Sequence, residues 1–215
     1  MSYKLLIFDW DGTLMDSEAK IVHCLEESIE YMNLSPKTNN ELKNVIGLGL
    51  FQAIYTLYPD ISEKNNHRFA NYYRETYVTK KSSVLFDRVI EMLHSLKSTG
   101  VMLAVATGKG RQGLNYVLEE VGLEQFFHAS RCADETFSKP NPKMLEEILD
   151  EFALLPENAI MIGDTDYDLQ MANNIKMDCI AVSYGVHERE RLSLCSPKAI
   201  FNDVKSLAVF LSHHT

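Results

Sequence analysis

The chain has 215 residues, of which 46% are hydrophobic and 24% are charged, and its formal net charge is −9. A chain of this size and composition builds one large domain, or one domain with a small second one, which excludes a disordered protein. The negative charge argues against a surface for nucleic acid or for an anionic membrane, so an anionic substrate needs local positive charge at its own site.

The first predicted element is a short apolar run, Leu5–Phe8, which ends in Asp9 and Gly12 and indicates a buried strand followed by a loop. Helical patterns come next, at residues 18–32, 40–46, 50–58 and 63–78, with no strand-like run between them. We therefore expect a small all-helical cap domain at residues 17–81, inserted after the first strand. The core domain would then comprise residues 1–16 and 82–215.

From residue 88 onward, predicted strands and helices alternate. Strands are expected at residues 101–106, 159–162 and 179–182, with weaker candidates at 126–130 and 199–201. Helices are expected at residues 88–99, 113–121, 142–152 and 168–174, the third with Asn141 as its N-cap and Pro142 at its first position. The alternation predicts an α/β fold with a Rossmann-like parallel sheet and helices on both faces, in which ligands bind beyond the carboxyl ends of the strands.

Cysteine use and the lack of long apolar runs in the sequence predict a cytoplasmic protein. The cysteines form neither a Cys-x-x-Cys pair nor a zinc-binding pattern, so we expect reduced thiols. They are Cys24, Cys132, Cys179 and Cys195. No run reaches the roughly 20 apolar residues of a membrane span, and the run that ends at Phe8 is too short for a signal peptide.

The sharpest motif, Asp9-Trp10-Asp11-Gly12, directly follows the first strand. Asp11 lies past the strand end, where the loop can turn its side chain back toward Asp9. Two carboxylates placed in this way can divide the work of phosphoryl transfer, because one attacks phosphorus and the other moves protons to the leaving oxygen and from water. An ordinary Asp-Gly turn after a strand stays open as the alternative.

A second acidic motif covers residues 163–168 and follows the strand predicted at 159–162. Its carboxylates, Asp164, Asp166 and Asp168, repel one another unless a cation lies among them, and their oxygens suit magnesium or calcium. An EF-hand is excluded, since Leu169 and Ile175 stand where that loop needs glycine and glutamate. A solvated acidic helix N-terminus is the alternative.

Two further segments offer groups for a phosphate. Thr107 and Gly108 bring a hydroxyl and backbone N–H groups to a strand end, which either cradle an oxyanion or form an ordinary loop. Lys139 lies among rigid neighbours before a helix and is either aimed at a ligand or solvated. Together with a cation held by Asp9 and Asp164, Lys139 would neutralise most of the charge that opposes attack on a phosphate dianion.

One segment and two single residues each allow two interpretations. The Gly-Leu-Gly-Leu segment at residues 47–50 is either a plain turn of the cap or a loop whose backbone faces the substrate. Lys109 and Arg111 follow the Thr107 loop, and they either contact a second anionic group of the substrate or are solvated surface charges.

In order and spacing, these motifs resemble those of the haloacid dehalogenase-like superfamily over essentially the whole chain. The resemblance implies that Asp9 is the nucleophile and forms an aspartyl-phosphate, and that Asp11 is the general acid/base. It also implies that the phosphoryl oxygens are held by Thr107, Gly108 and Lys139. The implied cofactor is Mg²⁺, bound by Asp9, the main-chain carbonyl of Asp11 and Asp164, with Asp168 binding through water or orienting the site. Asp166 lies outside the shared pattern.

The resemblance extends to the reaction and to the cap. The superfamily's true dehalogenases lack an acid at the second position of the first motif, so Asp11 implies phosphoryl chemistry. The helical cap resembles one that closes over the substrate and excludes water. Residues 132–136, leading into Lys139, look most like the phosphoglycolate phosphatase-like subgroup.

The implied protein is a magnesium-dependent phosphatase for a small phosphorylated metabolite, with phosphoglycolate as one candidate. It would be a monomer or homodimer with no nucleic-acid or membrane partner.

Other functions remain open on the same residues. A phosphosugar mutase, or a nucleotide or pyrophosphate hydrolase, would use the same core, and a mutase would yield an isomerised phosphosugar in place of free phosphate. A phospho-acceptor signalling module also combines acidic residues, threonine, lysine and Mg²⁺ on a parallel sheet. Its order does not match, because here the second acidic motif follows Thr107 and Lys139.

Overall fold

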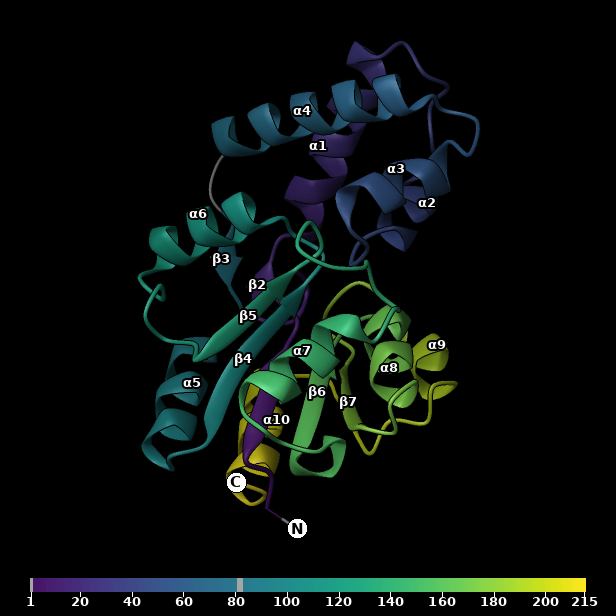
Figure 1. Ribbon diagram of the computed structural model, residues 1–215. Helices are drawn as coiled ribbons and strands as arrows, with labels where there is room; N and C mark the ends of the chain where they lie inside the picture. The colour runs from purple at the N-terminus through teal and green to yellow at the C-terminus, as the bar shows by residue number, and fades with distance from the viewer. Residues whose placement is uncertain (1, 81–82) are drawn as a thin grey trace.

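The computed structural model describes residues 2–80 and 83–215, and a parallel sheet of six strands forms its centre (Figure 1). The strand order is β5-β4-β1-β6-β7-β8, so β1 lies between β4 and β6. The strands are β1 Leu5–Phe8, β4 Met102–Thr107, β5 Ala129–Cys132, β6 Ala159–Gly163, β7 Asp178–Val182 and β8 Ile200–Phe201. All neighbouring strands run parallel, which confirms the predicted Rossmann-like α/β class.

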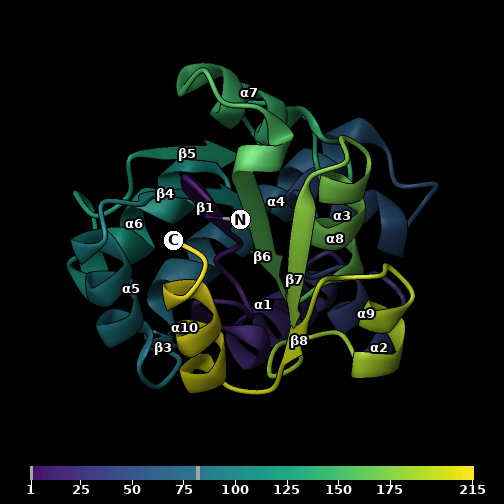
Figure 2. The ribbon, with the colours of Figure 1, turned by 90° about the horizontal axis from the view of Figure 1, so that it is seen from below.

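Helices cover both faces of the sheet because successive side chains of a strand point to opposite faces. Leu6 and Phe8 of β1 belong to one apolar core, with α5, α6 and α10, whereas Leu5 and Ile7 belong to a second core with α7 and α8. Figure 2 shows these two groups of helices on either side of the sheet. The helices are α5 Val89–Ser98, α6 Arg111–Val121, α7 Lys143–Glu151, α8 Asp166–Asn173, α9 Arg189–Ser193 and α10 Val204–Ser212, and a 3-10 turn covers Pro156–Asn158.

Four more helices lie beyond the carboxyl ends of the strands (Figure 1). They are α1 Glu18–Tyr31, α2 Asn39–Asn44, α3 Leu50–Leu57 and α4 Glu63–Thr79. Buried residues at helical spacing, such as Ile21, Leu25 and Ile29 of α1, hold this layer together. The predicted domain boundary between residues 81 and 82 lies outside the described residues. No helix within the described ranges is long and apolar enough to cross a membrane.

Several local features differ from the sequence prediction. A short antiparallel ribbon of β2 Met15–Asp16 and β3 Val84–Leu85 was not predicted, because strands of two residues leave no alternation to detect. Helices α6 and α8 each begin two residues earlier than predicted. The prediction of Asn141 as an N-cap was wrong, since Pro142 holds that position in α7. The Asn141 side chain nevertheless accepts a hydrogen bond of 3.0 Å from the backbone N–H of Lys143.

We expect Ile7→Ala to lower the free energy of unfolding by about 2–5 kcal/mol, because it opens a cavity in the middle of the sheet. Ile7 is fully buried and lies in register with Ala104 and Met161 of the flanking strands. Urea denaturation measures the change. The matched control is Ile90→Ala: Ile90 is 38% exposed, so its loss should stay below about 1 kcal/mol. Equal losses in the two variants would contradict the assigned core.

Candidate active site

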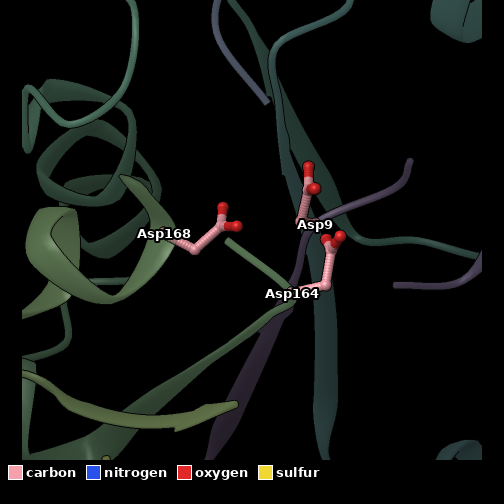
Figure 3. Close-up of side chains that lie close together, drawn as sticks. All are labelled: Asp9, Asp164 and Asp168. Carbon is pink, nitrogen blue, oxygen red and sulfur yellow. The ribbon is translucent and has the colours of Figure 1, made fainter. Parts of the chain in front are cut away.

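Three buried carboxylates meet at the carboxyl edge of the sheet: those of Asp9, Asp164 and Asp168 (Figure 3). Asp9 directly follows β1, Asp164 follows the neighbouring strand β6, and Asp168 lies in the first turn of α8. One oxygen of each lies within 4.8 Å of one oxygen of both others. Because β1 and β6 pair in register from Leu5 to Phe8, the residues that follow them necessarily emerge side by side.

Asp168 is oriented by the start of its own helix. Thr165 is the N-cap of α8, and its hydroxyl and backbone N–H donate to Asp168 Oδ2 at 2.6 and 3.2 Å. The Asp168 backbone N–H donates back to the threonine hydroxyl at 3.4 Å, which completes a capping box. The carboxylate therefore reaches the site from a fixed helix terminus, with Oδ1 directed at Lys139.

Lys139 supplies the one ammonium group that the structure places among these carboxylates in the described residues. Its side chain is fully buried, and Nζ lies 2.6 Å from Asp9 Oδ1 and 2.6 Å from Asp168 Oδ1. Burial alone would lower the pKa of Lys139, but Asp168 and Asp9 hold that pKa above its usual value. Lys139 is therefore a fixed positive charge against two acids, and not a solvated lysine.

One ammonium group does not balance three carboxylates. Burial, with the charges of Asp168 and Asp164, raises the pKa of Asp9 well above its usual range even though Lys139 opposes the shift. Burial and the charge of Asp168 raise the pKa of Asp164 to about 7. The cluster thus carries more negative charge than its own protein partners neutralise.

The donor set fits a metal ion. Asp9 Oδ2 is buried and has no hydrogen-bond partner among the described residues. Asp164 is held in place by the Thr13 hydroxyl, which donates to Oδ1 at 2.9 Å, and by the Val186 N–H, which donates to Oδ2 at 2.8 Å. Carboxylate oxygens alone suit a hard divalent cation. Gly12 keeps this space open, because a Cβ at its position would lie 2.1 Å from an oxygen of Asp164.

The Asp11 carboxylate is not part of this cluster. Its Oδ1 accepts a hydrogen bond of 2.6 Å from the Ser17 hydroxyl and lies 3.1 Å from Lys109 Nζ. Lys109 Nζ also donates to the hydroxyl of Tyr77, in cap helix α4, at 3.1 Å. The two aspartates of the first motif therefore have different partners: Asp9 faces Lys139 and the acidic cluster, and Asp11 faces the cap.

Thr107 and Gly108 lie at the end of β4, beside β1. Thr107 is buried, and its hydroxyl accepts a hydrogen bond of 3.1 Å from the backbone N–H of Lys109. A Cβ at Gly108 would lie 2.5 Å from the carbonyl oxygen of Gly47 and 2.6 Å from that of Leu48. Glycine at position 108 is what allows the cap loop to approach this closely.

The Gly-Leu-Gly-Leu segment is therefore more than a plain turn of the cap. Its carbonyl groups lie against Gly108, and the backbone N–H of Gly49 donates to the Ser138 hydroxyl at 2.8 Å, directly before Lys139. The loop thus spans the site between two of the predicted phosphate-binding segments.

Arg111 and Asp166 both bind groups outside the carboxylate cluster. Arg111 is turned away, since its guanidinium binds Glu135 at 2.7 and 2.8 Å and Ser130 at 2.8 Å.

Asp166 forms a separate network, in which hydrogen bonds from His187 and Arg191 lower its pKa to about 2 against the effect of burial. Ser17 and Tyr77 were not predicted as site residues. No motif spacing signals them, because both reach Asp11 or Lys109 only through the placement of the cap.

A cavity of about 570 Å³ joins the aspartates to the cap. Its lining includes Asp9 and Asp11 at one end and residues of α1, α3 and α4 at the other. Gly108 and Lys109 also line it, so two of the four motif segments face this cavity. A substrate bound there would have its reacting group at the strand ends and the rest of its body under the cap helices.

Comparison with known proteins matches this chain to one hydrolase family and to proteins named as phosphatases. The family model described as haloacid dehalogenase-like hydrolase matches residues 6–182. The probable phosphatase IndB of Dickeya dadantii is 30% identical over 91% of this chain and 88% of its own, and a phosphoglycolate phosphatase of Agrobacterium fabrum is 29% identical over 94% and 90%. The crystal structure of a predicted phosphatase from Clostridium acetobutylicum superposes with a TM-score of 0.87 at 27% identity, covering 99% of this chain and 100% of that one.

Because the carboxylates are crowded together, we expect the free energy of unfolding of the metal-free protein to fall as the pH rises. The carboxyl group of Asp164 titrates at 3.8 in an ordinary environment and at about 7 in the folded protein. Between these values the folded state binds more protons than the unfolded state, so the free energy of unfolding falls with pH. Thermal unfolding in EDTA at several pH values from about 4 to 7 measures this slope.

Two variants separate this effect from general acid and base sensitivity. Asp164→Asn removes the titrating group and should flatten the slope. Asp87→Asn removes a carboxylate that is 95% exposed and should leave the slope unchanged. An Asp164→Asn protein with the same pH slope as the wild type would show that Asp164 is not the cause.

Proposed function

The chain belongs to the haloacid dehalogenase-like hydrolases, and on this premise we propose that it is a magnesium-dependent phosphatase that hydrolyses a small phosphomonoester through an aspartyl-phosphate on Asp9. The observation that carries the proposal is the division of the first motif: Asp9 is held by Lys139 in the acidic cluster, while Asp11 is held separately at the cap side. Phosphoryl transfer needs a nucleophile and a proton-transfer group in this kind of arrangement.

In the first step, a carboxylate oxygen of Asp9 attacks phosphorus, and the bond from phosphorus to the alcohol oxygen breaks. Lys139 orients the carboxylate through its contact with Oδ1. Asp11 gives a proton to the departing alcohol and later takes one from the water that hydrolyses the aspartyl-phosphate. The Ser17 hydroxyl and Lys109 Nζ, both in contact with Oδ1, fix Asp11 in position.

Thr107, Gly108 and Lys139 hold the phosphoryl oxygens in this proposal. The Thr107 hydroxyl accepts its hydrogen bond from Lys109, so its own O–H is still available to donate to a phosphoryl oxygen. Lys139 adds positive charge on the side of Asp168. The closed cap loop over Gly108 limits the access of water while the phosphate is bound.

The proposed metal ion is Mg²⁺, held by Asp9, Asp164 and Asp168 and by the main-chain carbonyl of Asp11. When bound, it supplies positive charge that reduces the repulsion between Asp9 and the phosphate. The unpartnered oxygen of Asp9 and the raised pKa of Asp164 support a cation at this place.

The proposed partner is a small phosphorylated metabolite, and neither a nucleic acid nor a membrane is part of the proposal. A phosphoglycolate phosphatase among the relatives makes phosphoglycolate one substrate to test. Mutase activity on the same core would give an isomerised phosphosugar in place of free phosphate, so product analysis separates the two reactions.

We expect Asp9→Asn to reduce phosphate release from p-nitrophenyl phosphate by about a thousandfold or more, because an amide does not form the covalent intermediate. Asp11→Asn should reduce release of phosphate from alkyl phosphates by roughly 10²- to 10⁴-fold through the lost proton transfer. Asp87→Asn serves as the matched control and should keep full activity. Near-normal turnover by Asp9→Asn, with an unchanged circular dichroism spectrum, would refute the covalent mechanism.

Removal of divalent metal should abolish phosphate release, and Mg²⁺ should restore it. Asp164→Asn should raise the Mg²⁺ concentration needed for half-maximal activity by about tenfold or more, since it removes one charged oxygen ligand. Titration of activity with Mg²⁺ after dialysis against EDTA measures both effects. Full activity in EDTA would rule out the metal-dependent reaction.

A further inference from the structure

The cavity that leads from the aspartates is much larger than a small acidic leaving group requires. Its volume is about 570 Å³. A cavity of about 150 Å³ already holds a benzene ring. The phosphate would occupy the end at Asp9, so most of the remaining space lies under the cap helices and is available to the departing alcohol.

The cap side of this cavity is mostly apolar, with Asn71, Arg74 and Glu75 of α4 as its polar members. The lining includes the aliphatic side chains of Ile21, Leu25, Val45, Ile46, Leu48 and Val78. Three tyrosines, Tyr73, Tyr77 and Tyr116, add flat aromatic surface to the same lining. Burial raises the pKa of the Tyr73 hydroxyl well above its usual range, so this group stays neutral. Such a surface stabilises an apolar ligand body and penalises a charged one.

Lys109 and Arg74 are the two cations among the cavity-lining residues of the described ranges. Lys109 Nζ lies 3.1 Å from Asp11 Oδ1, so its charge is already neutralised. Arg74 is exposed at the rim, donates to Asn71 at 3.1 Å and lies over the ring of Phe51. A carboxylate or second phosphate in the cavity would lose hydration, and the acidic side chains of Glu75 and Asp134, which also line the cavity, would repel it.

Lys20 is a further cation near the cavity wall, and its Nζ is buried without a hydrogen-bond partner among the described residues. Lys20 Nζ lies 3.9 Å from the centroid of the Tyr77 ring, and Lys20 is not among the lining residues of the cavity. The ring of Tyr77 is also approached by Lys109 Nζ, 4.4 Å from the centroid. Both ammonium groups thus lie against the aromatic ring of Tyr77.

We propose that the departing group of the substrate is an uncharged alcohol that carries an apolar ring, and that the enzyme prefers such phosphomonoesters to phosphoglycolate. This inference rests on the proposed phosphatase function and specifies its substrate class. The ring would lie between the aliphatic side chains of α1 and the tyrosines of α4, with the phosphate at Asp9.

The test compares benzyl phosphate with phosphoglycolate on the wild-type protein with Mg²⁺. Both esters release a primary alcohol, so the bond that breaks is similar and the comparison reports binding of the leaving group. Burial of the phenyl ring predicts that kcat/KM for benzyl phosphate exceeds that for phosphoglycolate by about tenfold to a hundredfold. Phosphate release measures both reactions.

A matched pair of variants tests the cavity directly. Val78 and Val209 are each 52% exposed, and only Val78 lines this cavity. Val78→Ser should lower kcat/KM for benzyl phosphate by about threefold and leave that for phosphoglycolate within twofold. Leu48→Ser should lower the same ratio further, because Leu48 is more buried. Val209→Ser should leave the ratio unchanged.

The outcomes separate the inference from the proposed function. Phosphoglycolate turnover equal to or faster than benzyl phosphate turnover would overturn the ring-bearing substrate and leave the phosphatase proposal intact. Equal loss on both esters in Val78→Ser would overturn it as well. If neither ester nor p-nitrophenyl phosphate releases phosphate with Mg²⁺, the proposed function fails and the inference fails with it.

Discussion

The contact of Lys139 with Asp9 and Asp168 is the interaction on which the site depends. A fully buried ammonium group and two buried carboxylates lose most of their hydration, and only close contact among them offsets that loss. The three side chains come from the end of β1, the loop before α7 and the first turn of α8, so the pairing requires all three elements to be placed correctly. The apolar sheet provides this placement, because β1 is paired on both sides and buried on both faces.

The same charge balance explains why the cluster calls for an external cation. Asp164 stands beside the ion pair without an ammonium group of its own and is held by neutral donors, the Thr13 hydroxyl and the Val186 N–H. Neutral donors orient a carboxylate without cancelling its charge. The result is a set of buried carboxylate oxygens whose negative charge and oxygen chemistry fit a divalent ion.

Much of this arrangement could be predicted from the sequence, because it depends on local pattern and on one topological rule. Apolar runs that end in Asp9, Thr107 and Asp164 predict parallel strands, and the carboxyl ends of such strands meet at one edge. The contacts of Asp11 could not be predicted in this way. Ser17 reaches Asp11, and Tyr77 reaches the Lys109 that pairs with Asp11, through a ribbon of two-residue strands and the packing of four cap helices, which leave no signal in motif spacing. Arg111 shows the reverse case, since a position close to Thr107 in sequence did not bring its side chain to the site.

The contact between the cap loop and Gly108 is made by main-chain atoms, the carbonyl oxygens of Gly47 and Leu48. Main-chain contacts are insensitive to most changes in side-chain identity. The residues that line the cavity under the cap can consequently diverge during evolution without disturbing the contact that seats the loop on the core. The seating of this loop and the composition of the cavity lining are thereby separable, and the lining can change while the aspartates and Lys139 stay as they are.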